Sequence, residues 1–178
     1  MPPVRIFLAE DSPADVWLIT EALKRQSLEF AIDHFTTAEQ AIAAVRQCGQ
    51  NGNPIPDLLL LDYNLPQGHG GDILAAAATN PHLANVPKAI LTSWLRPLDA
   101  ERSRELGASC LITKPATLED FLEVVGTRVA QMLKPSYGGP PGPQPASWPA
   151  SHPVALPSRP GGRLRTGRSA VHRRPNGS

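Results

Sequence analysis

Four consecutive leucines at positions 58–61 lead directly into Asp62, and Pro56 and Pro66 bound the run. A short apolar run between prolines is typical of a strand that is buried on both faces, as in a parallel sheet covered by helices. Ligands of such open sheets bind in the crevice beyond the carboxyl ends of the strands. We therefore expect Asp62 to be the working residue and the rest of residues 1–133 to position other groups around it.

The chain on either side of this run alternates between strand patterns and helix patterns. The expected strands are residues 4–9, 30–35, 58–61, 88–92 and 110–113. The expected helices begin at Pro13 behind a Ser12 N-cap, behind Thr36 or Thr37, at Asp72, at Pro97 and behind Thr117. This alternation predicts an α/β fold, in which a five-stranded parallel sheet carries helices on both faces.

Residues 134–178 differ from the rest of the chain in composition. They contain 10 prolines, 7 glycines, 7 basic residues and no acidic residue, whereas residues 1–133 contain 10 basic and 16 acidic residues. Their apolar residues are too few to offset the entropy of ordering the chain. We predict a folded domain over residues 1–133 and a disordered Pro/Gly/Arg-rich tail over residues 134–178. Its arginines offer a contact for nucleic acid, but a solvated extension is the preferred interpretation.

The sequence also indicates the compartment. No apolar run approaches the ~20 residues of a membrane span, and the N-terminus lacks the pattern of a signal peptide. The two cysteines, Cys48 and Cys110, lack the spacing of a metal site, which favours a reduced environment over a disulfide framework. We expect a cytoplasmic protein that makes no membrane contact.

Polar residues follow four of the five expected strands. Glu10 and Asp11 follow the first strand, Asp62 follows the third, Thr92 ends the fourth and Lys114 follows the fifth. A parallel sheet brings these strand ends to one edge, where carboxylates raise each other's pKa values unless a cation neutralises them. The pattern therefore predicts a Mg²⁺ site, because Mg²⁺ is bound by one or two carboxylates and keeps several waters.

Such a site suits phosphoryl transfer to a carboxylate. Asp11 is the better direct ligand of the metal, Glu10 the better water-mediated ligand, and the carbonyl of Asn64 a plausible third ligand. Asp62 is the candidate nucleophile and a further ligand, since it is the carboxylate of the central strand. The lysine and the metal would neutralise the phosphoryl oxygens, and the threonine hydroxyl would hydrogen-bond the added group.

These features resemble the receiver domain of two-component response regulators, over residues 4–133. The matching motifs are Glu10-Asp11, residues 59–66 with Gly70, residues 91–93, and Lys114-Pro115. The resemblance implies a flavodoxin-like fold with the strand order 2-1-3-4-5. It further implies that Asp62 accepts a phosphoryl group from a sensor histidine kinase with Mg²⁺, that Lys114 contacts this group, and that Thr92 moves toward it. A cis peptide bond between Lys114 and Pro115 is also implied.

A narrower resemblance concerns the start of the first expected helix, Asp-Ser-Pro-Ala-Asp at residues 11–15, and the long loop over residues 47–56. Both are similar to stand-alone receivers, some of which are paired with bacterial phytochrome-type kinases. Members of that subgroup often form homodimers. The resemblance thus implies a single-domain regulator that signals through protein contacts.

Two residues depart from the pattern of the family. Leu111 stands where receivers usually carry Tyr or Phe, so a switch between the threonine and an aromatic ring is not expected here. Trp94 stands two residues after Thr92, where small or polar residues are common. We expect a surface tryptophan; the alternative hypothesis is that its ring shields the phosphoryl group from water.

Two other functions are open. A Mg²⁺-dependent phosphatase with an aspartyl nucleophile uses a similar crevice, but typically has a second aspartate where this chain has Asn64. We therefore do not expect an enzyme. The other alternative is a nucleic-acid binder that acts through the tail and is regulated by the receiver. His34 and His69 have no evident partners in the sequence, and both are expected to be surface or loop residues.

Overall fold

The computed structural model describes residues 2–94 and 96–134, so the predicted disordered tail lies outside the described residues except for Lys134. The strands of the main sheet are β1 (Val4–Ala9), β2 (Phe30–Phe35), β3 (Leu58–Asp62), β6 (Lys88–Thr92) and β7 (Cys110–Thr113). The helices are α1 (Pro13–Arg25), α2 (Ala38–Gln47), α3 (Gly70–Ala78), α4 (Pro97–Glu105) and α5 (Leu118–Met132). The predicted alternation of strands and helices is confirmed.

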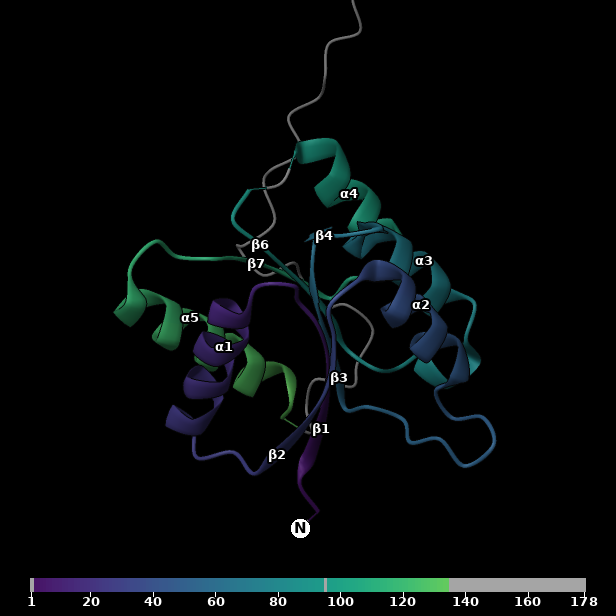
Figure 1. Ribbon diagram of the computed structural model, residues 1–178, viewed down its shortest axis with the longest axis horizontal. Coiled ribbons are helices and arrows are strands. Elements are labelled where there is room, and N and C mark those ends of the chain that lie inside the picture. The colour runs from purple at the N-terminus through teal and green to yellow at the C-terminus, as the bar shows by residue number, and fades with distance from the viewer. Residues whose placement is uncertain (1, 95, 135–178) are drawn as a thin grey trace, which may run out of the picture.

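The main sheet is parallel throughout, and its strand order is β2-β1-β3-β6-β7. This is the predicted order 2-1-3-4-5 in chain sequence. Helices α1 and α5 cover one face of the sheet, and α2, α3 and α4 cover the other (Figure 1). The predicted α/β fold with helices on both faces is therefore confirmed.

The four leucines of β3 supply both cores. Because successive side chains of a strand point to opposite faces, Leu59 and Leu61 pack under α2, α3 and α4, while Leu58 and Leu60 pack under α1 and α5. All four side chains are fully buried. This division explains why the central strand β3 is apolar at every position before Asp62, which lies at the carboxyl end of the strand.

Side-chain caps define the starts of three helices as predicted. The Ser12 hydroxyl accepts the N–H of Asp15 at the start of α1, Thr37 caps α2, and Thr117 caps α5. Each cap satisfies one backbone donor that lacks a partner in the first turn. The caps fix where the chain turns from the site edge of the sheet into α1 and α5.

The segment after β3 is more structured than the loop that the sequence predicted. A two-stranded antiparallel pair, β4 (Asn64–Leu65) and β5 (Gly68–His69), precedes α3. Helix α3 begins at Gly70 rather than at Asp72. Its N-cap is His69, and the carboxylate of Asp72, the third residue of the helix, accepts the backbone N–H of His69. A 3₁₀ turn, η1 (Pro81–Leu83), follows α3 and was also not expected.

The implied cis peptide bond is wrong for this structure. All peptide bonds of residues 2–94 and 96–134 are trans, including the bond between Lys114 and Pro115. The trans form is the lower-energy isomer even before proline, and the Lys114 side chain reaches the crevice with it. None of the helices that the structure describes has the length and apolar character needed to cross a bilayer.

Candidate functional site at the carboxyl edge of the sheet

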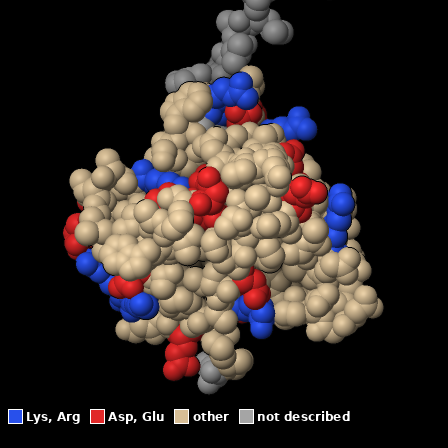
Figure 2. Space-filling view, viewed as in Figure 1, with Lys and Arg blue, Asp and Glu red and all other residues tan. Residues whose placement is uncertain are grey.

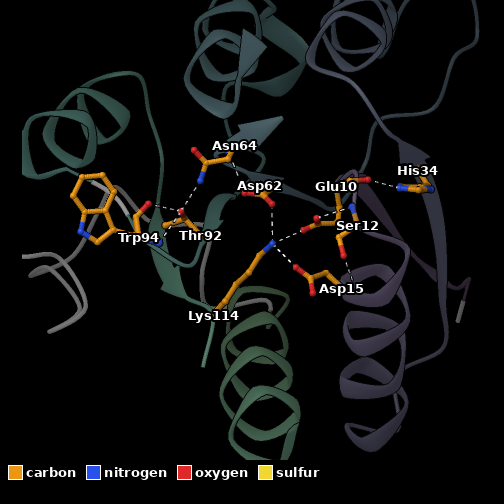
Figure 3. A network of polar contacts seen from close by, with 9 residues as sticks. All are labelled: Glu10, Ser12, Asp15, His34, Asp62, Asn64, Thr92, Trp94 and Lys114. Atoms are coloured by element: carbon orange, nitrogen blue, oxygen red, sulfur yellow. Dashed lines mark hydrogen bonds and ion pairs between the residues drawn. The ribbon is translucent and has the colours of Figure 1, made fainter. Parts of the chain in front are cut away.

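The carboxyl ends of four strands bring polar side chains together in one cluster. Glu10 follows β1, Asp62 ends β3, Thr92 ends β6 and Lys114 follows β7. Figure 3 shows the side chains of Glu10, Asp62 and Lys114 directed toward one another. Glu10, Asp62 and Thr92 are almost completely buried, with at most 6% of their surface exposed. The structure thus brings together side chains that are up to 104 positions apart in the sequence.

The Lys114 ammonium lies at the centre of this cluster. Its Nζ atom is 2.8 Å from Glu10 Oε2, 2.6 Å from Asp15 Oδ2 and 2.7 Å from Asp62 Oδ2. Burial alone would disfavour the charged ammonium, but the hydrogen bonds to Asp15, Asp62 and Glu10 outweigh it and hold the pKa of Lys114 above its usual range. The lysine is therefore a fixed positive charge beside Asp62.

A single ammonium cannot neutralise three carboxylates, and Glu10 shows the consequence. Burial raises the pKa of Glu10 to about 7, and repulsion from Asp62 adds to the rise against the hydrogen bond from Lys114. The other oxygen of Glu10 accepts the backbone N–H of Ser12 at 3.1 Å. The site holds more negative charge than Lys114 can balance, which is the condition that a bound cation would relieve.

Carboxylate oxygens of Glu10, Asp11 and Asp62 all lie within 4.8 Å of one another. Asp11 is exposed, whereas Glu10 and Asp62 are buried. Hard oxygen ligands in this number suit Mg²⁺, which takes one or two carboxylates directly and completes its octahedron with water. The donor set present therefore fits the predicted metal, and it contains three of the four residues that the sequence suggested as ligands.

Asn64, the fourth residue that the sequence suggested as a metal ligand, forms hydrogen bonds with residues at the ends of two neighbouring strands, β3 and β6. Its backbone N–H donates to Asp62 Oδ1 at 3.0 Å, and its side-chain Nδ2 donates to Thr92 Oγ1 at 3.4 Å. The two oxygens of Asp62 are thus held separately, Oδ1 by the Asn64 backbone and Oδ2 by Lys114. This leaves the Asp62 carboxylate in a fixed orientation at the mouth of the crevice.

The hydroxyl of Thr92 is engaged with the backbone of its own loop. It donates to the Trp94 carbonyl at 2.8 Å and accepts the Trp94 N–H at 3.3 Å. Trp94 is 70% exposed, and its indole ring lies away from Asp62 in Figure 3. This placement agrees with the expected surface tryptophan rather than with a shield over Asp62.

Leu111, which replaces the usual aromatic residue of receivers, is buried in the core beneath α2, α3 and α4. It contacts the same apolar cluster as Ala100 of α4 and Leu106, the residue that follows that helix. An aliphatic side chain enclosed in this way packs as a core residue. The absence of a switch between Thr92 and an aromatic ring at this position stays a prediction.

The structure adds one residue that the sequence reasoning missed. Asp15, in the first turn of α1, makes the shortest of the three contacts to Lys114. Asp is common in the first turn of helices because it favours the positive end of the helix dipole, so the position looked like an ordinary helix start. The available signal was the spacing, because Asp15 comes four residues after Asp11, close to one helical turn. This spacing could be used only once the direction of α1 was known.

Both histidines also acquire partners. His34 Nε2 lies 2.8 Å from the carbonyl oxygen of Glu10, so β2 supports the loop that carries the acidic pair. The His69 ring stacks on Tyr63 with a centroid distance of 5.2 Å, and its Nδ1 lies 3.4 Å from Asp72. Both residues remain exposed, as expected, but neither is isolated.

Comparison with known proteins identifies the family. Residues 6–126 match the response regulator receiver domain. The chain is a member of this family. It is similar to the response regulator Rcp1 of Synechocystis sp., with 37% identity over 125 residues, which are 70% of this chain and 85% of Rcp1.

Two solved structures extend the likeness to receivers. The phosphorylated cyanobacterial phytochrome response regulator RcpA has a TM-score of 0.66 and 33% identity, covering 74% of this chain and 94% of RcpA. The Mn²⁺-bound form of response regulator Rcp1 has a TM-score of 0.67 and 34% identity, covering 75% of this chain and 96% of Rcp1. The flavodoxin-like receiver fold inferred from the sequence is confirmed.

Proposed function

We propose that this receiver accepts a phosphoryl group on Asp62 from a sensor histidine kinase and signals through protein contacts. The observation that carries the proposal is the Asp62 carboxylate itself. It ends the central strand, its two oxygens are held by different donors, and Lys114 lies 2.7 Å away. Membership of the receiver family supports the same chemistry.

In this proposal an oxygen of Asp62 attacks the phosphorus atom of a phosphohistidine. The bond between phosphorus and the imidazole nitrogen breaks, and the nitrogen leaves with the electron pair. Lys114 stabilises negative charge on the phosphoryl oxygens, and the Asn64 N–H keeps the carboxylate aligned for attack. Mg²⁺ held by Glu10, Asp11 and Asp62 would supply further neutralisation of the phosphoryl oxygens and of the attacking carboxylate.

The proposed partners follow from the same relatives. Because Rcp1 and RcpA are response regulators and RcpA is named for a phytochrome, we include a phytochrome-type kinase among the candidate donors, with the reaction in the cytoplasm. The output surface is proposed to include Trp94, in the loop before α4, and Leu98, in the first turn of α4, which are 70% and 71% exposed. Large exposed apolar side chains close together in the sequence favour a protein partner or a second copy of the chain.

The decisive experiment is an intact-mass measurement after incubation with Mg²⁺ and acetyl phosphate. We expect one phosphoryl adduct, which is absent when EDTA replaces Mg²⁺ and absent from Asp62→Asn. Asp57→Asn is the matched control, because Asp57 lies at the opposite end of β3, is exposed and accepts only the backbone N–H of Arg5 among the contacts described. This variant should form the adduct like the unchanged protein.

Two outcomes would contradict the proposal. An adduct that persists in Asp62→Asn would place the acceptor elsewhere. Continuous release of phosphate with no adduct at any time would instead favour the phosphatase alternative, although the position two residues after Asp62 carries the amide of Asn64 rather than a carboxylate.

A further inference from the structure

Asp15 stands apart from the other carboxylates of the site. Its Oδ2 lies 2.6 Å from the Lys114 ammonium, closer than the oxygens of Glu10 and Asp62. It is nevertheless outside the group formed by Glu10, Asp11 and Asp62, whose oxygens gather within 4.8 Å. Asp15 thus contacts the lysine without belonging to the set that would hold the cation.

The lysine has no N–H group to spare. An ammonium has three N–H donors, and each of the three carboxylates around Lys114 occupies one of them (Figure 3). A phosphoryl oxygen that comes to this ammonium must therefore replace one of the present acceptors. Asp62 and Glu10 are the ones that would give way, because a cation attracts their oxygens and the phosphoryl group adds to Asp62 itself.

Contacts in the first turn of α1 hold Asp15 in place beside Lys114. Asp15 lies in the first turn of α1, where its backbone N–H is capped by Ser12, and Ser12 in turn donates to Glu10. A negative side chain at this end of a helix is also favoured by the helix dipole. Lys114 is the opposite case, since its long, flexible side chain has much rotamer entropy to lose. A short aspartate on a helix is suited to hold the end of that long side chain.

From this geometry we infer that Asp15 is a positioning residue, which holds the Lys114 ammonium beside Asp62 while the cation and the phosphoryl group draw the other two carboxylates away. The inference rests on the proposed phosphoryl acceptance at Asp62. Asp15 touches neither the reacting atoms nor the cation cluster, and it acts only through Lys114. The hydrogen bond from Lys114 to Asp15 is also the largest favourable contribution to the raised pKa of that lysine.

The test compares phosphorylation rates with acetyl phosphate and Mg²⁺ in four proteins: the unchanged chain, Asp15→Asn, Lys114→Met and the double variant. We expect Asp15→Asn to react about tenfold more slowly (about 1.4 kcal/mol), because a displaced charged group loses much of its effect on the transition state. Asp15→Glu should restore part of the rate. In the Lys114→Met background, Asp15→Asn should change nothing further.

If Asp15→Asn acted only by changing the charge of the site, it should raise the rate of phosphorylation instead of lowering it. Removing a negative charge near Asp62 would favour the approach of an anionic phosphodonor, so a faster reaction of Asp15→Asn would overturn the inference. An equal loss of rate with and without Lys114 would overturn it as well, because the effect would then not pass through the lysine. Glu21→Gln is the control, since it removes another acidic side chain of α1 whose partner is Lys24 rather than a site residue.

Two readouts do not require phosphorylation. Calorimetric titration with Mg²⁺ should show that Asp15→Asn lowers the affinity by less than about threefold, because its carboxylate lies outside the cation group and is paired with the Lys114 ammonium; a larger loss would make Asp15 a metal ligand instead. In urea unfolding of the same four proteins, Asp15→Asn should lower the midpoint clearly more where Lys114 is present than in the Lys114→Met background, where only the contribution of the helix dipole is lost. Equal shifts in both backgrounds would refute the ion pair.

The two proposals fail in different ways. If the unchanged protein forms no adduct while the urea cycle shows the coupling, the proposed function is wrong and the contact between Asp15 and Lys114 is real. If the adduct forms on Asp62 at the same rate in Asp15→Asn, the proposed function stands and the positioning role is wrong.

Discussion

Gly70 gives the most direct test of how the fold supports Asp62. The residue opens α3, and its backbone passes so close to β3 that a Cβ atom added there would lie 2.6 Å from the carbonyl oxygen of Asp62 and 3.1 Å from Tyr63 Cα. Both contacts are with backbone, which cannot rotate away as a side chain can. The Gly70 N–H also donates to the Tyr63 carbonyl at 2.9 Å, so the approach is part of the hydrogen bonding of the site.

The magnitude of Gly70→Ala combines two opposing effects. Overfilling a tightly packed position costs typically about 1–3 kcal/mol, since the backbone must shift. Replacing a helical glycine with alanine returns about 0.5–1 kcal/mol, because alanine has less conformational entropy to lose. We expect the free energy of unfolding to fall by about 0.5–2 kcal/mol, the difference of these two effects taken at their lower and at their upper values.

Gly71→Ala is the matched control. Its added Cβ would meet the ring of His69 at 3.1 Å, and that ring is an exposed side chain that can turn aside. The control should therefore be neutral or more stable by up to about 1 kcal/mol. Urea unfolding followed by circular dichroism measures both variants. Equal stability of Gly70→Ala and the unchanged protein, or an equal loss in Gly71→Ala, would refute the steric reasoning.

Three further predictions concern the core, the pH dependence and Trp94. Leu60→Ala, at a fully buried position, should lower the free energy of unfolding by about 2–5 kcal/mol in the same urea assay. Burial raises the pKa of Glu10 in the folded state, so the folded state binds its proton more tightly than the unfolded state does. The free energy of unfolding of the metal-free protein should therefore decrease as the pH rises from about 4.5 to about 7. This decrease should be absent from Glu10→Gln. Trp94→Ala should leave the lifetime of phosphorylated Asp62 unchanged, since the ring is exposed and lies away from the carboxylate; a shortened lifetime would restore the shielding hypothesis.

The sequence predicted the sheet because the physical signal of each strand is strong and local. A strand buried on both faces must be apolar at every position, and the four leucines before Asp62 satisfy this requirement. The polar residues that follow the strands then mark the edge where the chain leaves the core. In a parallel sheet this edge is shared, so the convergence of Asp62 and Lys114 could be predicted without coordinates.

Other features could not be predicted because they depend on how elements are placed in space. The β4–β5 pair has only two residues in each strand, which is too short to produce an alternating pattern. Asp15 resembles any acidic residue at a helix start until the direction of α1 relative to Lys114 is known. The isomer of the Lys114–Pro115 bond is set by a small energy difference and its tertiary surroundings, and the family pattern gave the wrong one.

The surroundings of Asp62 also show which contacts connect it with α4. Leu111 is buried and aliphatic, so it offers no polar link between the crevice and that helix. Two polar contacts occupy this region instead. The Thr92 hydroxyl is bonded to the backbone of Trp94 in the loop before α4. Burial raises the pKa of the Tyr63 hydroxyl, directly after Asp62, and the charge of Asp99 adds to the rise; Asp99 itself pairs with Arg96 at 2.6 Å across the first turn of α4. A phosphoryl group that drew the Thr92 hydroxyl toward Asp62 would have to break its hydrogen bonds to the backbone of Trp94, and the loop that carries the exposed indole would then have to rearrange.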